Sequence, residues 1–185
     1  MDSDIYPLMF EVESSYFWYV ARRKILLAQV QKLLATQKGP ETGLLDFGCG
    51  TGKGSVKLKE LGLEPQLIDF ADNCRDAEAA ELPFMEWDLT EKIPAESVYG
   101  FCTDVMEHIP TSDVGKVIDN IMACSEQVFF LISTVDDIGG QAIGATLHNT
   151  VKPHKWWLKQ FKGYNVSFDQ NADIASLFYV EQGVR

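Results

Sequence analysis

The sequence predicts an α/β fold, a three-layer sandwich in which helices cover both faces of a seven-stranded, mostly parallel sheet with an antiparallel edge strand. Short apolar runs alternate along the chain with helical or loop segments, which is the pattern of parallel strands joined by crossover connections. The 185 residues, 46% hydrophobic and 23% charged, suffice for one sizeable core of a globular protein. No apolar run reaches the roughly 18 residues of a membrane helix.

The net charge of −11 argues against nucleic acid or an anionic membrane as a partner, because both are bound through clustered Lys and Arg. The acidic start, Met1-Asp2-Ser3-Asp4, lacks the basic and apolar parts of a signal peptide, so we expect a cytoplasmic location. The cysteines include no CxxC pair, which favours free thiols over structural zinc. The sequence predicts no particular oligomeric state.

The first predicted element is an amphipathic helix from about Ser15 to Gln37, which Gly39-Pro40 ends. Strands are predicted next, wherever an apolar run is bounded by turn residues. They cover Gly43–Phe47, Gln66–Asp69, Phe84–Trp87, Val98–Thr103, Gln127–Ser133, Gly163–Phe168 and Ser176–Val180. The last two runs, joined by Asp169–Ala175, are expected to form an antiparallel hairpin at one edge of the sheet.

A helix is predicted over Thr111–Ser125, between the fourth and fifth strands, with Thr111 or Ser112 as its N-terminal cap. Its buried stripe would consist of Val114, Val117, Ile118, Ile121 and Met122. The link from Leu89 to Ser97, between the third and fourth strands, is too short for a full helix. We therefore expect a reduced crossover at that point.

A glycine-rich turn, Asp46-Phe47-Gly48-Cys49-Gly50-Thr51-Gly52, follows the first predicted strand. Glycines allow positive φ and a close approach of the backbone to a ligand. A phosphate-binding P-loop would need glycine at Phe47 and Ser or Thr at Gly54. The dinucleotide fingerprint fits poorly, because its third glycine would fall on Lys53 or Ser55. A tight turn without a ligand is the remaining alternative.

Asp46, Asp69 and Asp88 stand at the carboxyl ends of three successive predicted strands. A carboxylate beside a dinucleotide pyrophosphate would be repelled, whereas one near the positively charged amino group or sulfonium of S-adenosylmethionine is favourable. Asp69 could accept both ribose hydroxyls, and Asp88 could accept the adenine amino group. Each acid alone could be an ordinary loop residue. Their joint position favours S-adenosylmethionine.

The stretch Leu44–Gly52 resembles the first motif of the class I S-adenosylmethionine-dependent methyltransferases, which have a Rossmann-like fold, and the resemblance extends over nearly the whole chain. It implies that the glycine turn borders the methionine part of the cofactor, that Asp69 holds the ribose with Phe70 packing on the adenine, and that Asp88 and Leu89 read the adenine edge. The cofactor-binding residues that it implies are Arg22, Asp46, Phe47, Gly48, Cys49, Gly50, Gly52, Asp69, Phe70, Asp88, Leu89, Thr103 and Asp104.

Two further stretches resemble subgroups of that family. The stretch Asp104–Pro110 is similar to a segment of small-molecule methyltransferases such as the coenzyme Q O-methyltransferases, in which an acid-acid-histidine group can bind a divalent cation. Asp104, Glu107 and His108 hold those places, but we expect no metal and a His108 hydrogen-bonded to a neighbour. Tyr16–Arg23 resembles a helix of bacterial and phage members in which an arginine can face the cofactor carboxylate. Arg22 is that candidate, and a solvated helix face is the alternative.

The segment after the fifth strand includes Leu147–Trp157, which resembles a stretch of bacterial and phage methyltransferases. We interpret 1–185 as one class I methyltransferase domain, with an N-terminal helix region at 1–40 and a substrate lid at 135–162. Asp136–Gly140 has the turn residues of a mobile loop. His148 is the candidate catalytic base, and a hydrogen bond to loop backbone is the alternative. Of Trp156 and Trp157, only one can easily be buried, because adjacent helix positions diverge by about 100°.

The expected function is methyl transfer by in-line displacement to an oxygen or nitrogen of a small molecule or glycan precursor. The alternative is a non-catalytic module that binds S-adenosylmethionine or its demethylated product, S-adenosylhomocysteine. A nicotinamide-dependent oxidoreductase is disfavoured, because the glycines of the turn do not have the spacing of the dinucleotide-binding fingerprint.

Overall fold

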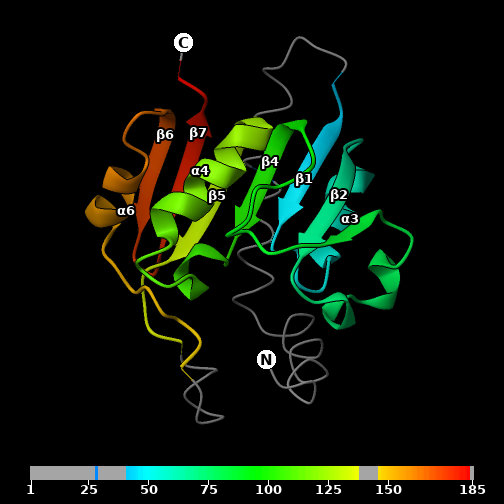
Figure 1. Ribbon diagram of the computed structural model, residues 1–185, viewed down its shortest axis with the longest axis horizontal. Helices are drawn as coiled ribbons and strands as arrows, with labels where there is room; N and C mark the ends of the chain where they lie inside the picture. Colours follow the sequence, from blue (N-terminus) through cyan, green and yellow to red (C-terminus); the bar gives the residue numbers. More distant parts are fainter. Residues whose placement is uncertain (1–27, 29–40, 138–145, 184–185) are drawn as a thin grey trace.

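A computed structural model describes residue 28 and residues 41–137 and 146–183, which form the coloured ribbon of Figure 1. The predicted helix over Ser15–Gln37 and the candidate Arg22 lie outside the described residues, apart from residue 28. The glycines of the predicted loop Asp136–Gly140 also lie outside them.

Seven strands form one sheet in the order β3-β2-β1-β4-β5-β7-β6. Their bounds are β1 Gly43–Phe47, β2 Glu64–Asp69, β3 Phe84–Glu86, β4 Ser97–Thr103, β5 Ser125–Ser133, β6 Asn165–Ala172 and β7 Ala175–Glu181. The first five strands pair in parallel, and β7 pairs antiparallel with both β5 and β6. The predicted sheet and its edge hairpin are therefore confirmed, with β7 as the inner strand of the hairpin.

In the described ranges 41–137 and 146–183, α-helices cover both faces of this sheet. They are α3 Lys53–Glu60, α4 Val114–Cys124 and α6 His154–Gln160. One core cluster joins α4 and α6 to the inward residues of the central strands, including Phe47, Phe130 and Phe178. A second cluster joins Leu58 of α3 to the alternate residues of the same strands, such as Phe129. In Figure 1, α4 lies in front of β4 and β5, and α3 lies behind β2.

The connections are shorter than those of a fully helical α/β fold. Two 3-10 turns, η1 Asp72–Cys74 and η2 Ala77–Ala79, link β2 to β3, and a third, η3 Met106–His108, follows β4. Residues 87–96, all of them described, run from β3 to β4 without a helix, which confirms the reduced crossover. The helix α4 buries the predicted stripe, from Val114 to Met122.

Two predicted boundaries were wrong. Helix α4 begins at Val114, so its N-cap position is Asp113 and not the predicted Thr111 or Ser112, and Asp113 makes no side-chain cap bond. The hydroxyl of Thr111 instead pairs with that of Thr150 at 2.8 Å. Strand β6 continues to Ala172, four residues beyond the predicted end. The segment that looked like a loop is polar because this edge strand is largely exposed and needs no apolar face.

Parallel strands end at a common edge, which we call the carboxyl edge of the sheet. The residues that follow β1, β2, β3, β4 and β5 all lie there, on the lower side of the sheet in Figure 1. In α/β sheets, ligands bind outside this edge. None of the helices in the described part of the chain has the length and apolarity that a membrane crossing requires.

Candidate functional site

The glycine turn joins β1 to α3 with three residues at positive φ, Gly48 at 69°, Gly50 at 52° and Gly52 at 73°. A Cβ on Gly48 would lie 2.4 Å from Val105 Cγ2, and one on Gly52 would lie 2.6 Å from Ala79 Cβ. Around Gly50, no heavy atom of the described residues comes within 4 Å of such a Cβ. Within the described residues, the space in front of Gly50 is therefore unfilled, as the close approach of a ligand requires.

Two buried carboxylates support this turn. Asp46 is 4% exposed, and its Oδ2 accepts the hydroxyl of Ser55 at 2.6 Å. Burial raises the pKa of Asp46 to about 7, although the bond from Ser55 acts in the opposite direction. Asp69 is 7% exposed, and its Oδ2 accepts the backbone N–H of Gly50 at 2.8 Å. Burial also raises the pKa of Asp69, while the N–H groups of Gly50 and its own following residues oppose that rise.

The residues predicted to hold an adenine come together beside this turn. Phe70, which is 58% exposed, and Asp88 line an open hollow of about 330 Å³. Its other walls are Glu86, Trp87 and Glu91. The carboxylate of Asp88 accepts the N–H of Thr90 at 2.8 Å, and this bond lowers the pKa of Asp88. An exposed aromatic ring beside an ionised acceptor is suited to stacking and hydrogen bonding a planar amino-bearing base.

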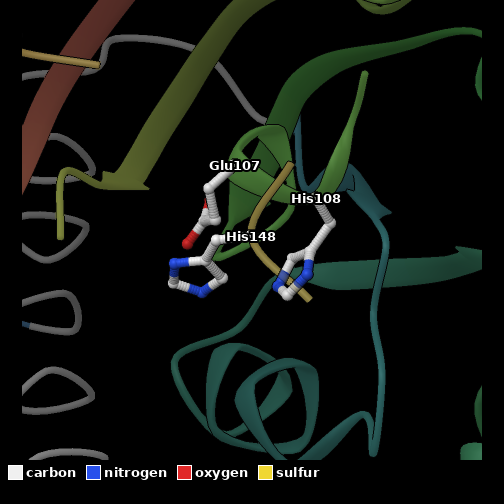
Figure 2. A group of neighbouring side chains, drawn as sticks. All are labelled: Glu107, His108 and His148. Carbon is white, nitrogen blue, oxygen red and sulfur yellow. The ribbon is translucent and has the colours of Figure 1, made fainter. Parts of the chain in front are cut away.

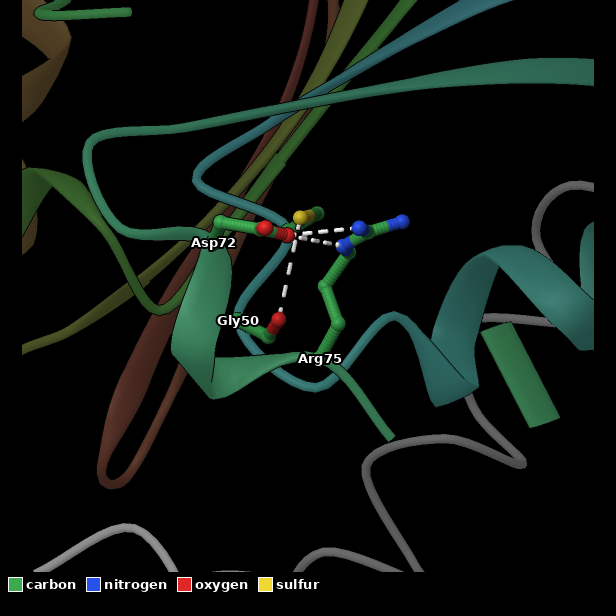
Figure 3. A network of polar contacts seen from close by, with 4 residues as sticks. Gly50, Asp72 and Arg75 are labelled. Carbon is green, nitrogen blue, oxygen red and sulfur yellow. Dashed lines mark hydrogen bonds and ion pairs between the residues drawn. The ribbon is translucent and has the colours of Figure 1, made fainter. Parts of the chain in front are cut away.

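The segment from η1 to η2 closes the far side of the turn. Arg75 Nε donates to Asp72 Oδ1 at 2.8 Å, and Figure 3 shows this pair above Gly50. The backbone N–H of Asp76 donates to the carbonyl of Thr51 at 2.9 Å. Lys53 Nζ lies 3.2 Å from Asp76 Oδ2. The contacts of Asp76 with Thr51 and Lys53, which are distant in sequence, were not predicted, because short polar 3-10 turns have no apolar periodicity.

The end of β4 lies beside the same turn. Thr103 is its last residue, and Asp104 follows with φ 55°, a conformation uncommon for a residue with a side chain. The N–H of Asp104 donates to the carbonyl of Leu131 at 2.9 Å, which holds this backbone in place. Strained backbone of this kind is concentrated at functional sites. The contact of Val105 with Gly48 brings Thr103 and Asp104 close to the glycine turn.

A second group of side chains lies farther along the carboxyl edge. Glu107 and His108 from η3 and His148 from the segment after β5 point toward one another in Figure 2. The rings of the two histidines meet edge to face, with centroids 4.9 Å apart. His108 Nδ1 lies 2.9 Å from the carbonyl of Leu147, which confirms the predicted hydrogen bond to a neighbour. Burial and the nearby His148 lower the pKa of His108.

His148 comes from residues 146–153, which we call the strap. Thr150 donates its N–H to the carbonyl of Glu107 at 2.9 Å and its hydroxyl to the carbonyl of Ile109 at 2.7 Å. Asn149 Nδ2 donates to the carbonyl of His108 at 2.7 Å. These bonds fasten the strap along η3, so His148 has a fixed position. Its Nδ1 lies 2.8 Å from the carbonyl of Val135, the loop-backbone bond that was the stated alternative.

Some predicted site residues can act only through their backbone. The side chains of Phe47 and Leu89 are buried in the core, at 0% and 8% exposure. Cys49 is partly buried, and its Sγ lies 3.7 Å from the carbonyl of Gly50. Sequence reasoning missed Ser55, the partner of Asp46, although a serine one turn before the buried Leu58 of α3 is a usable signal.

The comparisons with known proteins agree with this fold. A family model described as a methyltransferase domain matches residues 17–180. Curated protein sequences give no significant match.

Several solved structures have a similar fold. The magnesium protoporphyrin IX methyltransferase of Synechocystis PCC 6803, with bound SAH, gives a TM-score of 0.68 at 18% identity, over 89% of this chain and 85% of that one. DhpI in complex with SAH gives 0.72 at 15% identity, over 99% and 96% of the two chains. The N-methyltransferase NodS of Bradyrhizobium japonicum WM9, in complex with S-adenosylhomocysteine, gives 0.68 at 14% identity, over 93% and 90%.

Proposed function

The chain belongs to the methyltransferase-domain family, and on that premise we propose that it is an active class I methyltransferase with S-adenosylmethionine as its methyl donor. The observation that carries the proposal is the position of Gly50, where no described heavy atom lies within 4 Å of an added Cβ, beside the buried carboxylates of Asp46 and Asp69. Carboxylates at this position suit a ligand with a positively charged amino group and sulfonium, because a bound positive charge favours their ionised form. Structural relatives solved with S-adenosylmethionine or its product support the same choice.

In this proposal, three groups of residues bind the methionine, ribose and adenine portions of the cofactor. The glycine turn, with Cys49, Thr103 and Asp104 beside it, borders the methionine portion. Asp69 accepts hydrogen bonds from the ribose hydroxyls. Phe70 and Asp88 hold the adenine in their hollow, with the backbone of Leu89 next to them. When bound, S-adenosylmethionine supplies a methyl group on a positively charged sulfur. The chain's own contribution is to orient the acceptor and exclude water.

His148 is the proposed catalytic residue on the acceptor side. Because a carbonyl oxygen only accepts, the Nδ1–H of His148 donates a hydrogen bond to the carbonyl of Val135, and in the neutral ring Nε2 carries the lone pair. That nitrogen is suited to take the proton of an acceptor hydroxyl, as a general base does. The bonds between the strap and η3 support this role, because they fix the residue at the carboxyl edge.

The proposed acceptor is a small polar molecule or glycan precursor, methylated on oxygen or nitrogen in the cytoplasm. The net charge of −11 disfavours nucleic acid as the acceptor. Relatives named as methyltransferases of magnesium protoporphyrin IX and as an N-methyltransferase support the small-molecule class, but they leave the acceptor atom open.

Calorimetry on the purified full chain tests the proposal. S-Adenosylhomocysteine should bind at one molecule per chain, and NAD should not bind. Transfer of a radiolabelled methyl group from S-adenosylmethionine to a panel of small alcohols, phenols and amines then tests activity. NAD binding without S-adenosylhomocysteine binding would overturn the proposal. Binding of S-adenosylhomocysteine with no methyl transfer to any acceptor of the panel would favour the non-catalytic module instead.

A further inference from the structure

Glu107, His108 and His148 form a compact group of metal-ligating side chains (Figure 2). One ligand atom from each lies within 4.8 Å of the other two. A tetrahedral ion with bonds of about 2.0–2.2 Å places its ligand atoms about 3.3–3.6 Å apart, so side-chain movements of up to about 1.5 Å would bring all three onto one ion. The two histidines contribute nitrogen ligands, and Glu107 contributes a carboxylate.

The hydrogen bonds of both histidines leave the same nitrogen available. His108 Nδ1 lies 2.9 Å from the carbonyl of Leu147, and His148 Nδ1 lies 2.8 Å from the carbonyl of Val135. A carbonyl oxygen has no proton to give, so each Nδ1 carries a proton, and in the neutral form of each ring Nε2 then carries the lone pair that a metal needs. Metal-ligating histidines nearly always have this arrangement, in which the second nitrogen donates to a carbonyl or carboxylate.

The carboxylate is also held in position. Glu107 is 1% exposed, and its Oε1 accepts the N–H of Ser133 at 3.1 Å. Thr150 and Asn149 fasten the strap to the backbone of Glu107 and His108 at 2.9 Å and 2.7 Å. All three candidate ligands therefore stand on backbone that is fixed by hydrogen bonds, and preorganisation of this kind is what a metal site needs.

We propose that Glu107, His108 and His148 bind one divalent transition-metal ion, with zinc as the best-fitting ion, through the carboxylate and the two Nε2 atoms. Imidazole nitrogens favour zinc and its neighbours over magnesium and calcium, which prefer oxygen ligands. Two histidines and a glutamate are a known zinc ligand set. The set differs from the acid-acid-histidine group considered from the sequence, because His148 takes part and Asp104 is not a member of the converging group within the described residues.

This role rests on the proposed function and revises its acceptor side, because the ion would mark where the acceptor binds and would occupy the nitrogen of His148 that otherwise acts as the base. Three protein ligands leave a position open for an oxygen or nitrogen of a small molecule. With the ion bound, the lone pair of His148 is engaged, so His148 holds the metal. In the metal-free protein, the same lone pair is available for the acceptor's proton.

The test uses the full chain, stripped with EDTA and kept free of S-adenosylmethionine and its product, which bind metals themselves. Calorimetric titration with zinc chloride should give one ion per chain, and magnesium chloride should give no binding heat. Cobalt(II) chloride should produce visible absorption bands that zinc abolishes. These bands report ligand geometry and do not depend on methyl transfer.

Three variants and one matched control locate the ion. Asparagine in H108N and H148N can keep the bond of Nδ1 to the backbone carbonyl but removes Nε2, and E107Q keeps the shape of the carboxylate. Each should weaken zinc binding at least about tenfold. His154→Gln changes a histidine outside the group and should bind zinc like the unmodified chain. Circular dichroism and S-adenosylhomocysteine binding confirm that each variant is folded.

Two results would overturn the inference. One is the absence of one-to-one zinc and cobalt binding by the unmodified chain, and the other is unchanged zinc affinity in folded H148N. Either result leaves the methyltransferase proposal intact if S-adenosylhomocysteine still binds. Conversely, zinc binding by a chain that does not bind S-adenosylhomocysteine would support the metal site while rejecting the proposed function.

Discussion

At the scale of single residues, the glycines after β1 are of two kinds. Gly48 and Gly52 have neighbours so close that any side chain would overlap Val105 or Ala79, so these positions serve packing. Gly50 has positive φ, and no described heavy atom lies within 4 Å of an added Cβ, so we assign it to the proposed cofactor site. The sequence predicted the turn and its glycines, but all three look alike there, because the difference depends on neighbours from distant segments.

Gly50→Val should weaken S-adenosylhomocysteine binding at least about tenfold, about 1.4 kcal/mol, because the branched side chain fills the space that the cofactor needs. Gly62→Val is the matched control. Gly62 also has positive φ, 92°, and no described heavy atom within 4 Å of an added Cβ, but it lies in the turn before β2, at the opposite edge of the sheet. Both variants carry backbone strain, so strain alone would affect them alike. If the cofactor lies at Gly50, calorimetry should show lost affinity only in Gly50→Val. Equal affinities would contradict the placement of the cofactor.

Asp46 should make stability depend on pH. Its pKa rises from 3.8 to about 7 on folding, so the folded chain favours the protonated form. Its contribution to the free energy of unfolding is therefore complete below about pH 4 and is lost as the pH rises through about 7. Asp46→Asn is neutral at every pH and should not show this loss. Urea denaturation of both proteins at about pH 5 and about pH 8 measures the difference, and a difference that is the same at both pH values would refute the assignment.

At the scale of elements, apolar periodicity predicted what is buried and missed what is held by polar contacts. The stripe of α4 and the strands β1 and β5 follow from spacing alone. The end of β6 did not, since an exposed edge strand has the composition of a loop. The strap was predicted as part of a lid, but its attachment depends on the side chains of Thr150 and Asn149 bonding to backbone carbonyls. No local pattern encodes such bonds.

The paired tryptophans of α6 provide a test of packing. Trp157 is 0% exposed and belongs to the main core, whereas Trp156 is only partly buried, as the helical geometry predicted. Trp157→Ala should lower the free energy of unfolding by about 3–5 kcal/mol, because it leaves a large cavity. Trp156→Ala should cost about 1 kcal/mol. Urea denaturation measures both values, and equal costs would argue against the orientation of α6.

At the scale of the whole molecule, the fold class and the location of the site at the carboxyl edge followed from the order of strands and acids in the sequence. The sequence did not predict that Glu107 and His108 lie next to His148. The first two residues precede β5 in the chain and His148 follows it. Their convergence depends on the path of the strap, which periodicity does not determine. The role of Arg22 stays a prediction, since it lies outside the described residues.

Cofactor binding should stabilise the whole chain by mass action. S-Adenosylhomocysteine at about 100 times its Kd should add about 2.7 kcal/mol to the free energy of unfolding and raise Tm. NAD at the same concentration should leave Tm unchanged, because the glycine turn lacks the dinucleotide spacing. Differential scanning fluorimetry checks both ligands, with Gly62→Val as a control that should respond like the unmodified chain and Gly50→Val as a variant whose Tm should rise clearly less. A Tm increase with NAD alone would count against the cofactor assignment.

The two borders of the sheet have a consequence for association between copies of the chain. Strand β3 has only three residues, and β6 is polar and irregular between Val166 and Phe168. A foreign strand would therefore find no long, flat row of unpaired amides on either side. Extension of the sheet by a second molecule is disfavoured, so any contact between copies would have to use helices or loops.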